Sequence, residues 1–273
     1  MVTSAPGRCA VLLVLAAGCR DFSTPTSLFG APSPDLGPDL ASSPDLGSSL
    51  NLVSRHCATL SPSPRLCVDF DEGDPIGAGW SQVEMDQGTS LSLDSSIAFS
   101  APGSALARMI DAQSGCAYGR LDREWIGESA TALSLELQLR PSSPWIADRS
   151  VTEIFLEDSL GGTPCGLFFV LDSSAAGLTG AFVQVQVYGV SDRYLTLPPT
   201  RVPIIDAWTK LVFEVHDQAG VPQLTVSTGG VEALSAPLGE CKLGGHPRFA
   251  IGYHCEVGGP SEVRFDDVRF DFR

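Results

Sequence analysis

The stretch Leu133-Ser134-Leu135-Glu136-Leu137-Gln138-Leu139-Arg140 places an apolar side chain at every second position. Strand side chains alternate between the two faces of a sheet, so this stretch predicts a strand with one buried face and one wet face. The same alternation recurs at 182–188, 210–215 and 248–253, with turns rich in Gly, Ser, Asp and Pro between them. No long stretch shows a helical period. The pattern predicts an all-β fold, an antiparallel β-sandwich with its core between two sheets.

In the last predicted strand the apolar residues shift from odd-numbered to even-numbered positions part-way along. Val263 and Phe265 share one parity, whereas Val268, Phe270 and Phe272 share the other. A slip of one residue turns every later side chain to the opposite face, so the change predicts a β-bulge at Asp266-Asp267. We expect this bulge to bring the two neighbouring carboxylates to one edge of the sheet.

The first residues of the chain have the layout of a secretory signal. Arg8 precedes a short apolar run over 9–17, which is too short for a permanent membrane span. The ending Ala16-Ala17-Gly18-Cys19 resembles the lipobox of bacterial lipoproteins. The resemblance implies cleavage after residue 18, acylation of Cys19 and, because Arg20 follows rather than aspartate, an outer-membrane location. The alternative is an ordinary cleaved signal with an incidental cysteine.

Residues 19–54 read as a tether between the predicted lipid anchor and a folded domain over 55–273. They repeat Pro-Asp-Leu at Pro34, Pro38 and Pro44, with Gly, Ser and Ala in between. Proline resists helix and sheet and the aspartates repel one another, so we expect an extended, solvated and disordered segment. The repeat has a second interpretation, a recognition motif for a partner.

The excess of acidic over basic residues limits which charged molecules the protein can bind. The chain has a formal net charge of −15. Nucleic acid and anionic phospholipid are therefore unfavourable electrostatic partners. No other apolar run approaches the length of a membrane span, so the predicted lipid is the only expected contact with a membrane.

The cysteines predict a disulfide framework. Cys9 belongs to the signal and Cys19 to the anchor, which leaves Cys57, Cys67, Cys116, Cys165, Cys241 and Cys255. An even number in an exported chain predicts three disulfides, for which 15 pairings exist. We expect Cys57–Cys67 and Cys241–Cys255 as local links and Cys116–Cys165 as the long-range one. The alternative is a zinc site, because His246 and His254 lie close in sequence to Cys241 and Cys255.

Several motifs over about residues 60–273 resemble the concanavalin A-like lectin/glucanase jelly roll, in the laminin-G-like form found in exported bacterial proteins. They are Leu66–Gly73 followed by Trp80, the turn at 100–106, the strand Trp208–Val215, and Phe265–Phe270. The resemblance implies that the N- and C-terminal strands pair and that one sheet carries a ligand groove. It also implies a structural calcium ion near the paired strands, for which the candidate ligands are Asp69, Asp71, Asp266 and Asp267.

The segment Thr152-Glu153-Ile154-Phe155-Leu156-Glu157 resembles the catalytic strand of laminarinase- and lichenase-like glycoside hydrolases. In those enzymes the two glutamates that Glu153 and Glu157 match are nucleophile and acid/base in retaining hydrolysis. Phe155 replaces the aspartate that lies between them, and it cannot tune the protonation of its neighbours. We therefore favour a non-catalytic binding face over an enzyme.

The candidate binding face combines that segment with a neighbouring strand. Glu153, Phe155 and Glu157 would share the face with Phe182, Gln184, Gln186 and Tyr188. Sugar rings stack on aromatic side chains, and their hydroxyls bond to amides and carboxylates, so the mixture suits a glycan or surface polymer. Two other interpretations remain, a purely structural surface and a protein–protein adhesion or envelope-scaffold module.

Overall fold

The structure, a computed structural model, describes residues 57, 60–71, 73–110, 112–145, 148–156, 165–174, 177–187 and 191–273. Within these ranges, residues 112–116, 174, 177, 191 and 255–258 are described by their backbone only. The predicted signal, the tether and Cys19 lie outside the described residues. Among the helices that are described, none is both long enough and apolar enough to cross a membrane.

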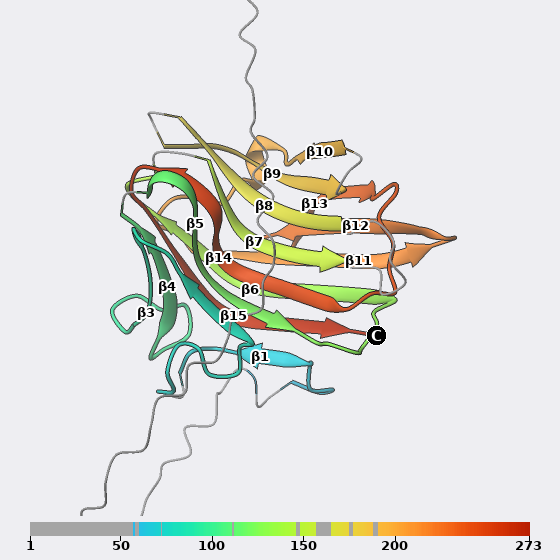
Figure 1. Cartoon of the computed structure of the whole chain (residues 1–273), viewed down its shortest axis with the longest axis horizontal. Coiled ribbons are helices and arrows are strands. Elements are labelled where there is room, and N and C mark those ends of the chain that lie inside the picture. The colour runs from blue at the N-terminus through green and yellow to red at the C-terminus, as the bar shows by residue number, and fades with distance from the viewer. Residues whose placement is uncertain are drawn as a thin grey trace, which may run out of the picture. The chain divides into compact units, whose positions relative to one another are not determined.

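Two antiparallel sheets form the folded unit (Figure 1). The eight-stranded sheet has the order β13 (Val231–Pro237), β12 (Val221–Thr228), β11 (Thr209–Gln218), β6 (Ala132–Ser142), β15 (Ser261–Phe272), β4 (Ser104–Met109) and β3 (Thr89–Asp94), and β1 (Leu66–Val68) also pairs with β15. The seven-stranded sheet has the order β10 (Ser191–Thr196), β9 (Gly177–Val187), β8 (Cys165–Ser174), β7 (Arg149–Leu156), β14 (Pro247–Gly258), β5 (Ala112–Glu124) and β2 (Gln82–Met85). A short 3-10 helix, η2 (Pro199–Arg201), precedes β11. The predicted β-sandwich is confirmed.

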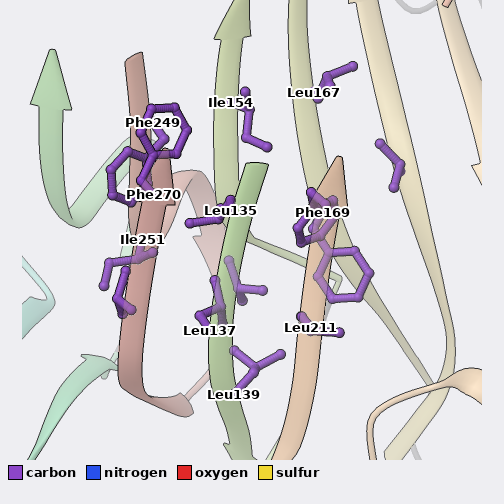
Figure 2. Close-up of a cluster of buried hydrophobic side chains, with 14 of the residues drawn as sticks. Leu135, Leu137, Leu139, Ile154, Leu167, Phe169, Leu211, Phe249, Ile251 and Phe270 are labelled. Atoms are coloured by element: carbon purple, nitrogen blue, oxygen red, sulfur yellow. The ribbon is translucent and has the colours of Figure 1, made fainter. Parts of the chain in front are cut away.

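The core lies between the two sheets, as the alternation predicted (Figure 2). Leu135, Leu137 and Leu139 of β6 are fully buried, whereas the residues between them are partly exposed. Phe249 of β14 stacks on Phe270 of β15 with 4.5 Å between ring centroids. This contact joins the central strands of the two sheets, so burial of apolar area holds the layers together.

The bulge in β15 is confirmed. The register between β15 and β6 shifts between Asp266 and Arg269, and Asp267 has a φ of 48°. Before the bulge β15 pairs with β4, and after it β15 pairs with β1, from Leu66↔Phe270 to Val68↔Val268. The pairing of β1 with β15 is the contact between N- and C-terminal strands that the jelly-roll resemblance implied.

The disulfides correct part of the predicted framework. Cys57–Cys67 is confirmed. Cys165 pairs with Cys241, so the predicted pairs Cys241–Cys255 and Cys116–Cys165 are wrong. Proximity in sequence misled the prediction, because the fold brings the start of β8 next to the segment that precedes β14. The same bond removes the Cys241 thiol from the zinc alternative, and the side chains of Cys116 and Cys255 lie outside the described residues.

Candidate functional site

The outer face of the seven-stranded sheet brings most of the predicted binding residues together. Glu153 of β7 pairs with Phe168 of β8, Phe168 pairs with Gln184 of β9, and Gln184 pairs with Tyr194 of β10. Residues paired in this way share a face, so the four side chains form one row across four strands. The adjacent rows carry the other predicted residues, Phe155, Gln186 and Phe182. Glu157 and Tyr188 lie outside the described residues.

A hollow of about 480 Å³ lies on this face, over strands β7 to β10 and β14. Its described lining consists of Asp148, Ser150, Phe168, Val170, Phe182, Gln184, Gln186, Tyr194 and His254. The volume falls within the usual range of small-ligand sites, and the lining combines aromatic rings with amides and a carboxylate. Three of these residues, Phe182, Gln184 and Gln186, were predicted from the sequence.

Aromatic rings form the apolar part of the hollow. Phe182 and Tyr194 meet edge to face with 5.5 Å between their ring centroids, and the ring centroids of Phe168 and His254 are 5.1 Å apart. Tyr194 is 58% exposed, so its ring is open to a ligand. The Gln184 amide donates a hydrogen bond to Asp192 of β10 at 3.1 Å, which orients the amide beside the rings.

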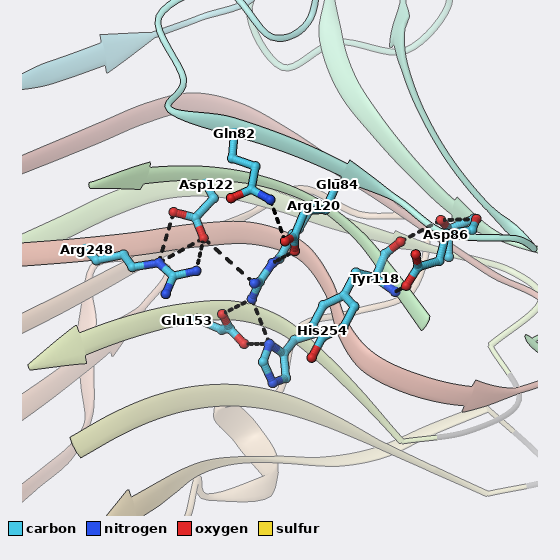
Figure 3. A network of polar contacts seen from close by, with 10 residues as sticks. Gln82, Glu84, Asp86, Tyr118, Arg120, Asp122, Glu153, Arg248 and His254 are labelled. Atoms are coloured by element: carbon cyan, nitrogen blue, oxygen red, sulfur yellow. Dashed lines mark hydrogen bonds and ion pairs between the residues drawn. The ribbon is translucent and has the colours of Figure 1, made fainter. Parts of the chain in front are cut away.

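A polar network adjoins the hollow and surrounds Arg120 of β5 (Figure 3). Arg120 Nη1 lies 2.6 Å from Glu153 Oε2, and Arg120 Nε lies 2.6 Å from Glu84 Oε2. His254 Nδ1 contacts the other oxygen of Glu153 and lies 2.8 Å from Arg120 Nη1. The Glu153 side chain is 2% exposed, so it is a buried carboxylate neutralised by its partners.

A second arginine of the face is held in the same way. Arg248 of β14 pairs with Asp122 of β5 through both Nε and Nη2, and its guanidinium lies 4.7 Å from the ring centroid of Phe155. Phe155 is itself buried, in a small cluster with Phe168, Val170 and Phe182. Glu153, Phe155 and Phe168 therefore form the floor of the face, and a ligand would meet Gln184 and Tyr194 first.

Glu153 was predicted as a site residue and His254 was named only as a zinc candidate, whereas the arginines and the other acidic residues of the network were not predicted from the sequence. Arg120, Asp122 and Glu124 alternate with Leu121 and Arg123 on β5, which is a weak signal in a chain with so many polar strand faces. Burial raises the pKa of Tyr118, which lies next to the network with the Arg120 guanidinium 4.7 Å from its ring centroid. Only the pairing of β5 with β14 and β2 shows that these side chains converge.

The four aspartates suggested for calcium lie near the bulge in β15 and the turn before β4. Asp266 accepts N–H donors from Phe99 at 2.8 Å and Ser100 at 3.0 Å, and both Asp266 and Asp267 accept from the Ser100 hydroxyl. Burial, together with the charge of Asp267, raises the pKa of Asp266 to about 7.

Asp71 accepts the N–H of Gly103 at 3.0 Å, and Asp69 accepts the N–H of Asp71 at 3.4 Å. These acceptor contacts anchor the turn before β4. No group of three or more His, Cys, Asp or Glu side chains among the described residues is arranged to hold a metal ion. Calcium binding by the four aspartates stays a prediction.

A second hollow, of about 340 Å³, lies on the other sheet. It is lined by Ala132, Leu133, Ser134, Glu214, Val215, His216, Asp271, Phe272 and Arg273. Besides the imidazole of His216, Phe272 is its only aromatic lining residue among those described, and that ring is packed against Trp125 and is mostly buried. The described lining therefore offers no open Phe, Tyr or Trp ring for a ligand to stack on, and the seven-stranded sheet carries the better candidate site.

Comparison with known proteins supports the fold. No family model and no curated protein matches the sequence. The chain is similar in structure to the endo-β-1,4-glucuronan lyase from the fungus Trichoderma reesei, with 11% identity, a TM-score of 0.59, and coverage of 77% of this chain and 96% of that one. It is also similar to the cellulose induced protein Cip1, with 13% identity, a TM-score of 0.53, and coverage of 75% and 96%. The TM-scores show a shared fold, and at identities this low the activity must be inferred from the site itself.

Proposed function

We propose that the chain is a non-catalytic glycan-binding protein that uses the hollow on the seven-stranded sheet. The observation that carries the proposal is the row of an open aromatic ring, an amide and a buried ring at Tyr194, Gln184 and Phe168. The apolar face of a sugar stacks on the open ring of Tyr194, its hydroxyls exchange hydrogen bonds with the amide, and Phe168 packs beneath them. The structural likeness to a glucuronan lyase supports a glycan-related role.

The network on the same face argues for binding rather than hydrolysis. A retaining glycosidase needs two carboxyl groups about 5–5.5 Å apart that both reach the substrate. Glu153, one of the two candidates, is buried and ion-paired with Arg120. The other candidate, Glu157, lies outside the described residues. Hydrolysis by this pair therefore has less support than binding.

A glycan array tests the proposal, with Tyr194→Ala as the variant and Phe99→Ala as the control. Phe99 is also an exposed aromatic residue, at 51%, but it lies near the bulge in β15 and not at the hollow. Loss of one stacking ring is expected to weaken binding roughly three- to tenfold in Tyr194→Ala, and Phe99→Ala is expected to bind normally. An array without any bound sugar would favour an adhesion or scaffold module instead.

We also propose that the protein is lipid-anchored through Cys19 at the bacterial outer membrane, with residues 19–54 as the spacer. The sequence around the cysteine supports this proposal, because a single run ending in Ala-Ala-Gly-Cys supplies the signal, the cleavage position and the acylated residue. Cys19→Ser is expected to move the protein from the membrane fraction to the soluble fraction. Mass spectrometry of the native chain would show no acyl groups if the proposal is wrong.

A further inference from the structure

Acidic side chains surround the hollow of the proposed glycan site. Asp148 lines it, Asp172 of β8 adjoins Asp148, and Asp192 of β10 holds the Gln184 amide. Among the described lining residues, His254 is the one side chain that can become a cation, and it contacts the Glu153 carboxylate. The hollow therefore meets its ligand with a negative potential.

The pair Asp148 and Asp172 shows how crowded these negative charges are. The two carboxyl groups hydrogen-bond to each other, which, with burial and the charge of Asp148, raises the pKa of Asp172. Asp148 also accepts the N–H of Ser173 at 2.9 Å, which fixes its position. The shared proton leaves the hydrogen-bonded pair with one negative charge, so a ligand anion would be repelled by the pair and a ligand cation would be attracted to it.

Three arginines lie next to the hollow, and none presents its guanidinium to a ligand. Arg149, which follows Asp148, is 1% exposed and donates to the backbone carbonyls of Asp148 and Gly259. Arg120 is 6% exposed and its charge is divided between Glu84 and Glu153. Arg248 pairs with Asp122 and packs over Phe155. Both guanidinium groups neutralise carboxylates of the sheet itself, so neither is free to bind the carboxylate of an acidic sugar.

We propose that this hollow selects glycans by charge: an amino-sugar chain binds most tightly, its neutral counterpart less tightly, and a uronate chain least. The inference rests on the proposed glycan-binding function and names its ligand class. One ligand charge roughly 8 Å from one carboxylate in water changes affinity about two- to threefold. Two such charges acting together, one on the Asp148–Asp172 pair and one on Asp192, therefore predict a change of up to about tenfold per ligand charge.

The test uses three oligosaccharides of equal length with the same β-1,4 linkage, built from glucose, glucosamine or glucuronate. Calorimetric titration at low salt, at a pH that keeps the amine protonated, is expected to give the order glucosamine, glucose, glucuronate, with up to about tenfold between neighbours. Added salt screens the charges and is expected to reduce the differences in affinity between the three oligosaccharides. Equal affinities, or a preference for glucuronate, would overturn the charge selection while leaving glycan binding intact. If none of the three chains binds, the charge selection fails, and the glycan array decides the proposed glycan-binding function separately.

Variants that neutralise chosen acidic residues show which carboxylates cause the dependence of affinity on ligand charge. Replacing both Asp148 and Asp172 with asparagine removes the negative charge of the pair, and an amide–amide hydrogen bond can still join the two positions. We expect the ratio of glucosamine-chain to glucuronate-chain affinity to fall several-fold in Asp148→Asn/Asp172→Asn and also in Asp192→Asn, which alters an exposed residue. Glu214→Gln removes the same charge from the exposed face of β11 in the other sheet and is expected to leave the ratio unchanged. An equal change in all three variants would contradict a local effect.

Discussion

Replacing Arg120 with methionine tests whether the network beneath the hollow is held by a buried ion pair. The change removes the guanidinium that lies 2.6 Å from Glu153, and leaves the buried Glu153 carboxylate with the His254 contact and the more distant charge of Arg248. Removing one partner of a buried ion pair leaves the other charge buried and unpaired. Such a change typically lowers the free energy of unfolding by about 3–5 kcal/mol. We expect a loss of this size in urea unfolding followed by tryptophan fluorescence.

Arg108 provides a matched control for this prediction. Arg108 Nε lies 2.8 Å from Glu262 Oε1, a similar distance, but the two side chains are 45% and 30% exposed. Water compensates the carboxylate that remains in Arg108→Met, so we expect a loss of only about 0.2–1 kcal/mol.

The double variant Arg120→Met/Glu153→Leu completes the test. It removes both charges and fills their space with apolar atoms, so it is expected to recover at least about 2 kcal/mol relative to Arg120→Met alone. Glu84 stays partly exposed and keeps its contact with water. If the effects of the two substitutions on the free energy of unfolding simply add, or if Arg120→Met lowers it no more than Arg108→Met does, Arg120 and Glu153 do not form a stabilising buried ion pair.

Three further changes test other parts of the fold. Replacing Cys165 and Cys241 with alanine is expected to lower the unfolding free energy by about 4–5 kcal/mol, since this link spans 76 residues; a change below about 1 kcal/mol in urea unfolding would contradict the chain-entropy estimate. The folded state holds a proton on Asp266 up to about pH 7, whereas the unfolded chain releases it near its ordinary pKa of 3.8, so stability falls as pH rises from about 4 to 7, by up to roughly 4 kcal/mol. Asp266→Asn removes that titration, and a pH profile with the same slope in the variant would exclude Asp266 as the cause. Gly252 has a φ of 111°, and a Cβ there would lie 2.8 Å from the Arg120 Cα, so Gly252→Ala is expected to lower the melting temperature far more than Gly229→Ala, where the space is open.

The alternation in the sequence predicted the fold because burial between two sheets requires it. Leu135 and Leu137 follow the simple period, and the parity change around Asp266 revealed even the bulge. The disulfides were harder to predict, because the partner of Cys165 depends on how the loops fold and not on spacing.

The candidate site was only partly predictable for a similar reason. Phe182 and Gln184 lie on one strand, so their common face follows from the period of two. Arg120, Glu153 and His254 come from three strands, and their convergence depends on the order and register of β5, β14 and β7. The order of strands in a sheet does not follow from the period of two, so the ion pairs that neutralise the buried Glu153 were not predicted.

Hydrogen exchange with and without a bound oligosaccharide shows which sheet carries the binding face. A sugar identified on the array is expected to slow exchange in β8, β9 and β10, whose outer faces line the hollow, and to leave β11, β12 and β13 of the other sheet unchanged. Protection confined to the eight-stranded sheet would place the binding site there and rule out the hollow.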